Sequence, residues 1–210
     1  NDTFFKFYTD PTRYERTGQN NARALLYDNK NRLWIACKDK TIAIYDNSHN
    51  FLGYLHFDGS VSMQPDTSLG MAYAITQDKS GTIWIGTKGN GLIEVQPGHS
   101  SLHFLLKQYK YSVEDIYSLS HNDIYAVCED AVGRIWIATF GGGVNYMEQI
   151  EGKTRFINYR NKLKKFPIPL CYRTRDLVSD GNGRIWIATS NGLLACKEKF
   201  SDAEQLEFEH

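Results

Sequence analysis

The sequence predicts an all-β fold built from four copies of one antiparallel sheet. Three observations support this prediction. Tryptophan recurs at a regular spacing, turn-forming residues stand at fixed positions around it, and the residues directly beside it are apolar. Of the 210 residues, 41% are hydrophobic and 23% are charged, so the chain has enough apolar surface to bury a core.

The tryptophan spacing defines a repeat. The separations are 50, 52 and 50 residues, at Trp34, Trp84, Trp136 and Trp186. An aspartate stands six residues before each tryptophan, at Asp28, Asp78, Asp130 and Asp180. The shared pattern is D-x-x-[GN]-x-[IL]-W-I-[AG]-[TC]. Self-similarity at this period is typical of propellers and solenoids.

Each copy of the pattern predicts a β-hairpin. Strand-like stretches precede the aspartates at 23–27, 72–77, 124–129 and 175–179, and a second strand follows each glycine. The Asp-x-x-Gly segment between them predicts a turn. Aspartate accepts hydrogen bonds from backbone N–H groups two residues on, and glycine or asparagine adopts the positive φ that the turn requires.

A second turn and two further strands complete each unit. Gly- and Asn-rich turns stand at 88–91, 140–143 and 190–192, and the first copy has a weaker signal at 38–40. Third strands are predicted at 42–45, 92–95, 144–147 and 193–196, and fourth strands at 51–57, 102–109, 155–159 and 205–208. Four antiparallel strands in about 50 residues make one blade of a β-propeller.

The predicted organisation is a single β-propeller segment over residues 1–210. Its blade units are 22–57, 72–109, 124–159 and 174–208, and 4–8 is predicted to be the orphan outer strand of a preceding blade. Tryptophan and isoleucine alternate on opposite faces of the second strand, as expected for a sheet covered by a blade on each side. Four blades make a partial propeller, a small closed ring, or a ring that a second chain completes.

The repeat resembles the two-component regulator propeller repeat, most clearly at Ala72–Gly91 and Leu119–Thr139. The resemblance implies the periplasmic sensor region of hybrid two-component histidine kinases of gut Bacteroidetes, whose ligands are largely oligosaccharides from glycan breakdown. Those proteins also have two seven-bladed propellers, a β-sandwich, a membrane helix and a kinase. With about four blades, this chain resembles a piece of such a sensor or a small stand-alone relative.

Several classes of function are disfavoured by the residues themselves. Lys and Arg number 24 and Asp and Glu number 24, so the net charge of zero argues against nucleic-acid binding. No apolar run approaches the about 18 residues of a membrane helix, so we expect no direct membrane contact. Metal-ligand spacings and catalytic or dinucleotide fingerprints are missing, so we expect no metal, no cofactor and no enzyme activity.

The prediction for function is therefore a non-catalytic, extracytoplasmic sensor propeller that recognises glycan-derived oligosaccharides. A protein-interaction scaffold without a small-molecule ligand is the main alternative, and a propeller lyase is a further one. The open end blades of a four-blade piece would expose apolar faces, so self-association into a homodimer is also predicted.

The repeated residues are interpreted as structural. The four tryptophans are expected to pack blade against blade, and the four aspartates to close turns, rather than to stack sugars or to act as acids and bases. Cys37, Cys128 and Cys196 are predicted to be buried free thiols. Cys171 is predicted to lie in a loop and to be the one reactive or bridged cysteine.

The candidate ligand site lies on the face where the blade-to-blade loops meet the turns between second and third strands. The loops span 58–71, 110–123 and 160–173. Sugar recognition combines aromatic faces with amide and charged donors. The candidates of these types are Asn90, Phe140, Tyr172 and Arg173.

Overall fold

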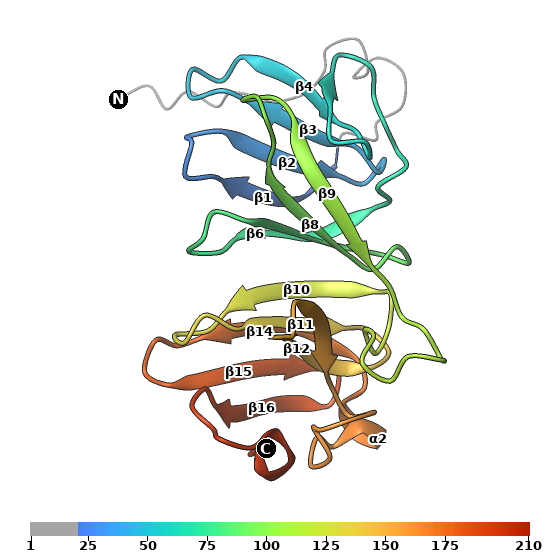
Figure 1. The fold of residues 1–210 in the computed structure, drawn as a ribbon, viewed down its shortest axis with the longest axis vertical. Helices are drawn as coiled ribbons and strands as arrows, with labels where there is room; N and C mark the ends of the chain where they lie inside the picture. Colours follow the sequence, from blue (N-terminus) through green and yellow to red (C-terminus); the bar gives the residue numbers. More distant parts are fainter. Residues whose placement is uncertain (1–20) are drawn as a thin grey trace.

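The computed structural model describes residues 21–210, which form four antiparallel sheets (Figure 1). Strand order within each sheet follows the chain, so each strand pairs with the one before it. This arrangement confirms the predicted all-β propeller fold. The predicted orphan strand at 4–8 lies outside the described residues.

Each sheet is one blade. Blade 1 contains β1 (Ala22–Tyr27), β2 (Leu33–Cys37), β3 (Ile42–Tyr45), β4 (Phe51–Leu55) and β5 (Val61–Ser62). Blade 2 contains β6 (Ala72–Gln77), β7 (Ile83–Thr87), β8 (Leu92–Pro97) and β9 (Phe104–Tyr109). Blade 3 contains β10 (Ile124–Glu129), β11 (Ile135–Thr139), β12 (Gly143–Ile150) and β13 (Lys153–Ile157). Blade 4 contains β14 (Thr174–Ser179), β15 (Arg184–Thr189) and β16 (Gly192–Lys197).

The inner strands of the blades pack in one line. Strand β1 packs on β6, β6 on β10, and β10 on β14. Figure 1 shows blade 1 and blade 4 at opposite ends of the molecule, with β6 and β10 between them. Within the described residues the blades therefore form an arc, which is the partial-propeller arrangement.

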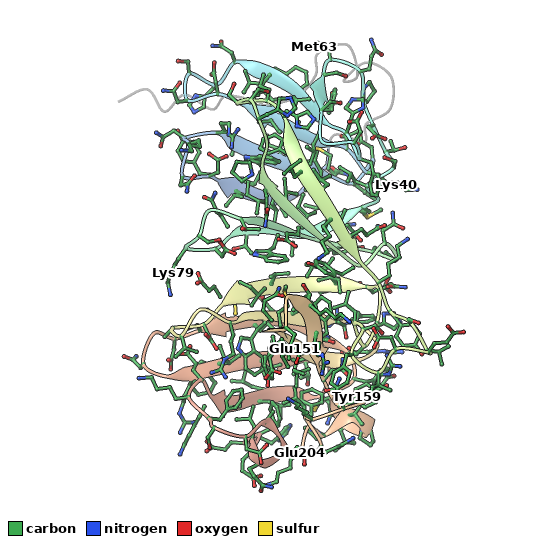
Figure 2. The ribbon with its side chains drawn as sticks, in the orientation of Figure 1. Lys40, Met63, Lys79, Glu151, Tyr159 and Glu204 are labelled. Carbon is green, nitrogen blue, oxygen red and sulfur yellow. The ribbon has the colours of Figure 1, made fainter. Side chains whose placement is uncertain are left out.

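The turns of the blades lie on two opposite faces of the arc. Lys40, at the turn between β2 and β3, and Lys79, at the turn between β6 and β7, lie at opposite edges in Figure 2. The blade-to-blade loops return on the Lys40 side, where the Phe140 N–H donates to the Asp123 carbonyl oxygen over 2.9 Å. We call this side the loop face and the opposite side the hairpin face.

The aspartate of each repeat binds both its own turn and the tryptophan. One carboxylate oxygen accepts from the backbone N–H four residues on, and the other accepts from the indole Nε1 of the tryptophan. The four indole bonds measure 2.8, 2.8, 2.9 and 3.1 Å from blade 1 to blade 4. This aspartate–tryptophan clasp joins the two ends of the hairpin turn, and the sequence pattern did not reveal it.

The core lies between the blades. Trp34 contacts the isoleucine face of blade 2, Trp84 that of blade 3, and Trp136 that of blade 4. These three side chains are buried, whereas Trp186 is partly exposed. The apolar Ile-Trp-Ile segments thus stabilise the interfaces between blades, where burial is worth about 25 cal/mol per Å² of apolar surface.

The C-terminal segment differs from the predicted outer strand at 205–208. A 3-10 turn covers Ala203–Gln205, and a single antiparallel bridge joins Ala195 to Glu209. Ala203 and Leu206 are buried in the core between blades 3 and 4. This segment therefore covers the end of that core and does not form an outer strand.

The loop at 160–173 contains a short helix that the sequence analysis did not predict. This helix, α2, covers Ile168–Cys171 and begins with Pro167 at its N-cap. Cys171 is the last residue of this helix, is 1% exposed and is free, so its prediction as a bridged or reactive cysteine in a loop is wrong. In the part of the chain that the structure describes, no helix has the length and apolar character needed to cross a bilayer.

Candidate functional site

Each inner strand has a β-bulge at the same repeat position. The pairing register shifts between residues 22 and 24, 72 and 74, 124 and 126, and 174 and 176. A bulge leaves one residue outside the ladder of paired residues and redirects its side chain. The bulged residues are Arg23, Tyr73, Tyr125 and Arg175.

The bulged side chains form a continuous stack with Phe140. The rings of Tyr73 and Tyr125 stack at 4.7 Å and 18°, and those of Tyr125 and Phe140 at 4.8 Å and 18°. Arg23 lies 5.0 Å from the Tyr73 ring, and Arg175 lies 5.0 Å from the Phe140 ring. We call these five residues the aromatic ladder. It is a three-ring stack with a guanidinium group at each end, and it connects all four blades.

The structure brings three of the four predicted site residues to one end of this ladder. Phe140 and Arg173 form an antiparallel bridge, and the Tyr172 carbonyl oxygen accepts from the N–H groups of Gly141 and Gly143 at 3.0 and 2.9 Å. The Arg173 guanidinium group lies 5.5 Å from the Phe140 ring and 5.0 Å from the Tyr172 ring. Phe140, Tyr172 and Arg173 therefore form one surface with the ladder, on the loop face.

Asn90 is placed differently. Its Nδ2 donates to the carbonyl oxygens of Ser68 and Leu69, each at 3.2 Å. The close approach leaves no room for a side chain at Gly70, where a Cβ would lie 2.7 Å from the same Nδ2. The amide of Asn90 thus fastens the β7–β8 turn to the preceding loop and is not directed to the ladder.

A tight turn holds Phe140 in place. Gly141 has a φ of +156°, and a Cβ there would lie 2.5 Å from the ring of His121. His121 itself accepts a hydrogen bond at Nδ1 from the Asp123 N–H. Because neither the turn nor the loop beneath it has spare room, the Phe140 ring is held in the stack.

The arginines of the site have no carboxylate partner among the residues that the structure describes. Within residues 21–210, Arg23, Arg173 and Arg175 form no ion pair, although the Arg175 Nε donates to the Ser190 hydroxyl over 3.3 Å. Burial, followed by the nearby Tyr73 and Asp123, raises the pKa of Tyr125. Its hydroxyl is therefore a neutral group at physiological pH, able to donate or accept a hydrogen bond.

The ladder residues outside Phe140 were missed by the sequence analysis. Arg23, Tyr73, Tyr125 and Arg175 each stand five residues before a repeat aspartate, so the repeat itself carried the signal. Two of them are aromatic and two are arginine, so the shared position is hidden by the change in residue type. The signal that marks them is a large side chain at the same position in all four aligned copies of the repeat.

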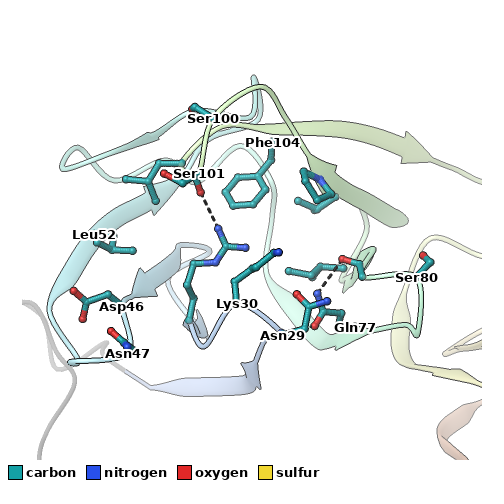
Figure 3. Close-up of a pocket in the computed structure, with 16 residues that line it drawn as sticks. Asn29, Lys30, Asp46, Asn47, Leu52, Gln77, Ser80, Ser100, Ser101 and Phe104 are labelled. Atoms are coloured by element: carbon teal, nitrogen blue, oxygen red, sulfur yellow. Dashed lines mark hydrogen bonds between the residues drawn. The ribbon is translucent and has the colours of Figure 1, made fainter.

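A separate cavity lies between blades 1 and 2 on the hairpin face (Figure 3). Its volume is about 750 Å³, and its lining includes the apolar residues Ile83, Val95 and Phe104. Two of its three charged lining residues, Arg32 and Asp46, are engaged within the protein. The Arg32 guanidinium group donates to the Ser101 carbonyl oxygen at 2.8 Å, and Asp46 accepts from Asn50. No group of three or more metal-ligating side chains gathers anywhere in the described part of the chain.

Comparison with known proteins agrees with this architecture. Residues 68–89 and 118–141 match the family described as two component regulator propeller. These two segments of the chain are thus similar to two-component regulator propeller repeats. No curated protein matches it.

Several solved structures share the fold of this chain. One is the extracellular domain assigned to a hybrid two-component system of Bacteroides thetaiotaomicron, with a TM-score of 0.66 and 20% identity over 91% of this chain and 24% of that one. A second such domain from the same organism has a TM-score of 0.52 and 20% identity over 84% and 28%. A catalytically inactive virginiamycin B lyase from Staphylococcus aureus has a TM-score of 0.60 and 14% identity over 91% and 56%.

The chain is short relative to these structures. It spans about a quarter of the length of the two Bacteroides domains. At 20% identity or less, the three structures show a shared fold, and a lyase and extracellular domains of two-component systems are both represented among them.

Proposed function

We propose that this propeller segment is the non-catalytic, ligand-recognising part of a periplasmic sensor of the hybrid two-component type. We further propose that its ligand is an oligosaccharide released from a glycan. The observation that carries this proposal is the aromatic ladder, which together with the adjacent Arg173 places three stacked rings and three arginines on the loop face. The matching repeats support the sensor class.

The ladder suits a polar ring-shaped ligand. Half-buried tyrosines and an exposed Tyr172 offer apolar edges for sugar C–H groups, and the guanidinium and phenol groups offer hydrogen-bond donors for sugar hydroxyls. Because the rings are stacked on one another, little side-chain entropy is lost when the ligand binds.

The ladder also offers a route from binding to signalling. Arg23, Tyr73, Tyr125 and Arg175 come from β1, β6, β10 and β14, so a bound ligand contacts the inner strands of several blades. A ligand that binds one relative arrangement of blades better than another shifts the population toward it. The sensor output would follow from that shift.

Isothermal titration calorimetry of the 210-residue protein against a panel of neutral and acidic oligosaccharides tests the proposal. We expect at least one member to bind, and Tyr125→Ala to weaken it at least tenfold. Tyr27→Ala, which removes an exposed tyrosine from the other end of an inner strand, is the matched control. Heat from no member of the panel, or equal weakening by both variants, would contradict the proposal.

A second candidate function, protein interaction, is favoured by the outward face of blade 4. Val178 is 57% exposed, Leu193 is 52% exposed, and Trp186 lies beside Val178 in the paired strands. This face fits the predicted self-association into a homodimer. Light scattering after size exclusion tests it, and a monomer at tens of micromolar protein would count against it. A lyase, the third alternative, would reveal itself by cleaving a member of the oligosaccharide panel.

A further inference from the structure

We propose that the aromatic ladder recognises an anionic saccharide, carrying carboxylate or sulfate groups, and that Arg173 and Arg175 bind the anionic group. This inference rests on the proposed function and specifies the chemistry of its ligand. It predicts which members of an oligosaccharide panel bind, and which residues decide the choice.

Charge is the first argument. Three other arginines are paired with carboxylates: Arg32 with Asp28 at 2.7 Å, Arg134 with Asp130 at 3.0 Å, and Arg184 with Glu209 at 2.7 Å. Within the described residues, the guanidinium groups of Arg173 and Arg175 have no such partner. An arginine pair that the fold leaves without a carboxylate is available to bind an external one.

The position of the two arginines is the second argument. Arg173 and Arg175 both lie over the Phe140 ring, at 5.5 and 5.0 Å from its centroid. Like charges at the same ring repel each other, and a bound anion between them would relieve that repulsion. Their planar forks match the geometry of carboxylate and sulfate oxygens, which arginine binds in a bidentate manner.

The acidic residues nearby do not supply this anion. Asp123 and Arg175 both act on the Tyr125 phenol, Asp123 raising its pKa and Arg175 lowering it, but within the described residues Asp123 forms no ion pair with Arg173 or Arg175. Asp176 follows Arg175 in β14, and its Oδ1 accepts from the Leu177 N–H at 2.9 Å. Among residues 21–210, neither of these two carboxylates forms an ion pair with the arginine pair.

The stack also selects for a saccharide over a flat aromatic anion. Tyr125 has Tyr73 on one face and Phe140 on the other, and Phe140 has Tyr125 on one face and the arginines beside it. A nucleobase needs a free ring face, whereas a sugar binds through hydroxyl hydrogen bonds and small C–H patches. Tyr125 and the exposed Tyr172 provide such contacts next to the arginine pair.

The experiment compares sugars that differ only in charge. The 210-residue protein is titrated with trigalacturonate against galactotriose, and with a sulfated chondroitin disaccharide against its unsulfated form. We expect the charged member of at least one pair to bind at least tenfold more tightly than the other. That preference should shrink as NaCl is raised from 50 to 300 mM.

The variants locate the preference. Arg173→Gln with Arg175→Gln should weaken the charged sugar at least tenfold and leave any neutral binding within threefold. Arg155→Gln, which removes an arginine stacked on Tyr117 at 4.7 Å, is the matched control and should change neither. Circular dichroism and the urea midpoint verify that the double variant is folded.

Three results would overturn the inference. Neutral and charged sugars could bind equally, the double variant could retain the preference, or inorganic sulfate could bind as tightly as the sulfated disaccharide. The first two leave the proposed function intact if Tyr125→Ala still abolishes neutral binding. Silence from every sugar would instead remove both the proposed function and this inference.

Discussion

Blades 3 and 4 contain the same hairpin in two different environments. In both, the repeat aspartate accepts from the tryptophan indole, at 2.9 Å in blade 3 and 3.1 Å in blade 4. Asp130 is 1% exposed and Trp136 is fully buried, whereas Asp180 is exposed and Trp186 is partly exposed. The clasp therefore forms within one hairpin, and its burial comes from the following blade.

A second contact shows the same difference. The backbone N–H that follows the repeat aspartate donates to an acceptor on the next blade: Asn29 to Gln77 at 2.7 Å, Lys79 to Glu129 at 2.8 Å, and Ala131 to Glu198 at 3.3 Å. In blade 4 the Gly181 N–H instead donates to the hydroxyl oxygen of Ser179, in the same blade, at 3.4 Å. We call the first three contacts inter-blade staples. They join each hairpin turn to its neighbour.

The largest expected effect comes from removing the tryptophan in each environment. Trp136→Ala should lower the free energy of unfolding by about 3–5 kcal/mol, because it empties a buried site between two blades. Trp186→Ala should cost about 1–2 kcal/mol, since part of this side chain already contacts solvent. Urea denaturation measures both. Equal losses would mean that the outward face of blade 4 is covered in solution.

Removing the repeat aspartate should also destabilise blade 3 more than blade 4, with a smaller difference between the two losses than for the tryptophan. Asp130→Ala leaves the Trp136 indole and the Arg134 guanidinium without their buried acceptor and should cost about 3 kcal/mol. Asp180→Ala should have a smaller effect because water replaces the lost acceptor. The difference between the two urea midpoints tests this. If Asp180→Ala were the more damaging change, the clasp would not depend on burial.

The staples are expected to contribute about 1 kcal/mol each. Glu129→Ala should lower stability by that amount and accelerate hydrogen exchange of the Lys79 amide, whereas Glu129→Gln should preserve both. Glutamine is the matched control because Gln77 already accepts the staple between blades 1 and 2. In the unmodified protein, the Gly181 amide should exchange faster than that of Lys79. Equal protection of these two amides would contradict the assignment of the staples.

The repeat pattern predicted the blades well because local chemistry determines them. The Asp-x-x-Gly turn requires a positive φ, and Gly133 at +90° and Asn31 at +60° supply it. The ladder could not be predicted in the same way. Its rings meet only because a bulge redirects Tyr125 and because the loop packed beneath Phe140 fixes that ring. Both depend on contacts between segments that are far apart in the sequence.

The end of the chain shows a further limit of pattern reasoning. Strand propensity at 205–208 predicted an outer strand, yet Leu206 is buried with Trp136 in the core between blades 3 and 4. A strand there would place these residues on the sheet edge. Burial of apolar surface between blades outweighs the pairing of one more strand, and a single bridge from Ala195 to Glu209 remains.

The effect that is smallest near neutral pH is a dependence of stability on alkaline pH at the interface between blades 3 and 4. Burial raises the pKa of Cys128 and of Cys196 to about 12 each, whereas the pKa of a cysteine thiol in an unfolded chain is about 8.5. The folded state therefore holds more protons between these values. The stability that the neutral thiols contribute is complete below about pH 8.5 and is lost as the pH rises toward 12. Urea midpoints at pH 7.5, 9 and 10.5 should fall less steeply in the Cys128→Ala, Cys196→Ala double variant than in the unmodified protein. Cys37→Ala, a single change in blade 1, is the comparison. If the urea midpoint of the double variant fell as steeply with pH as that of the unmodified protein, ionisation of these two buried thiols would not be the cause of the alkaline loss of stability.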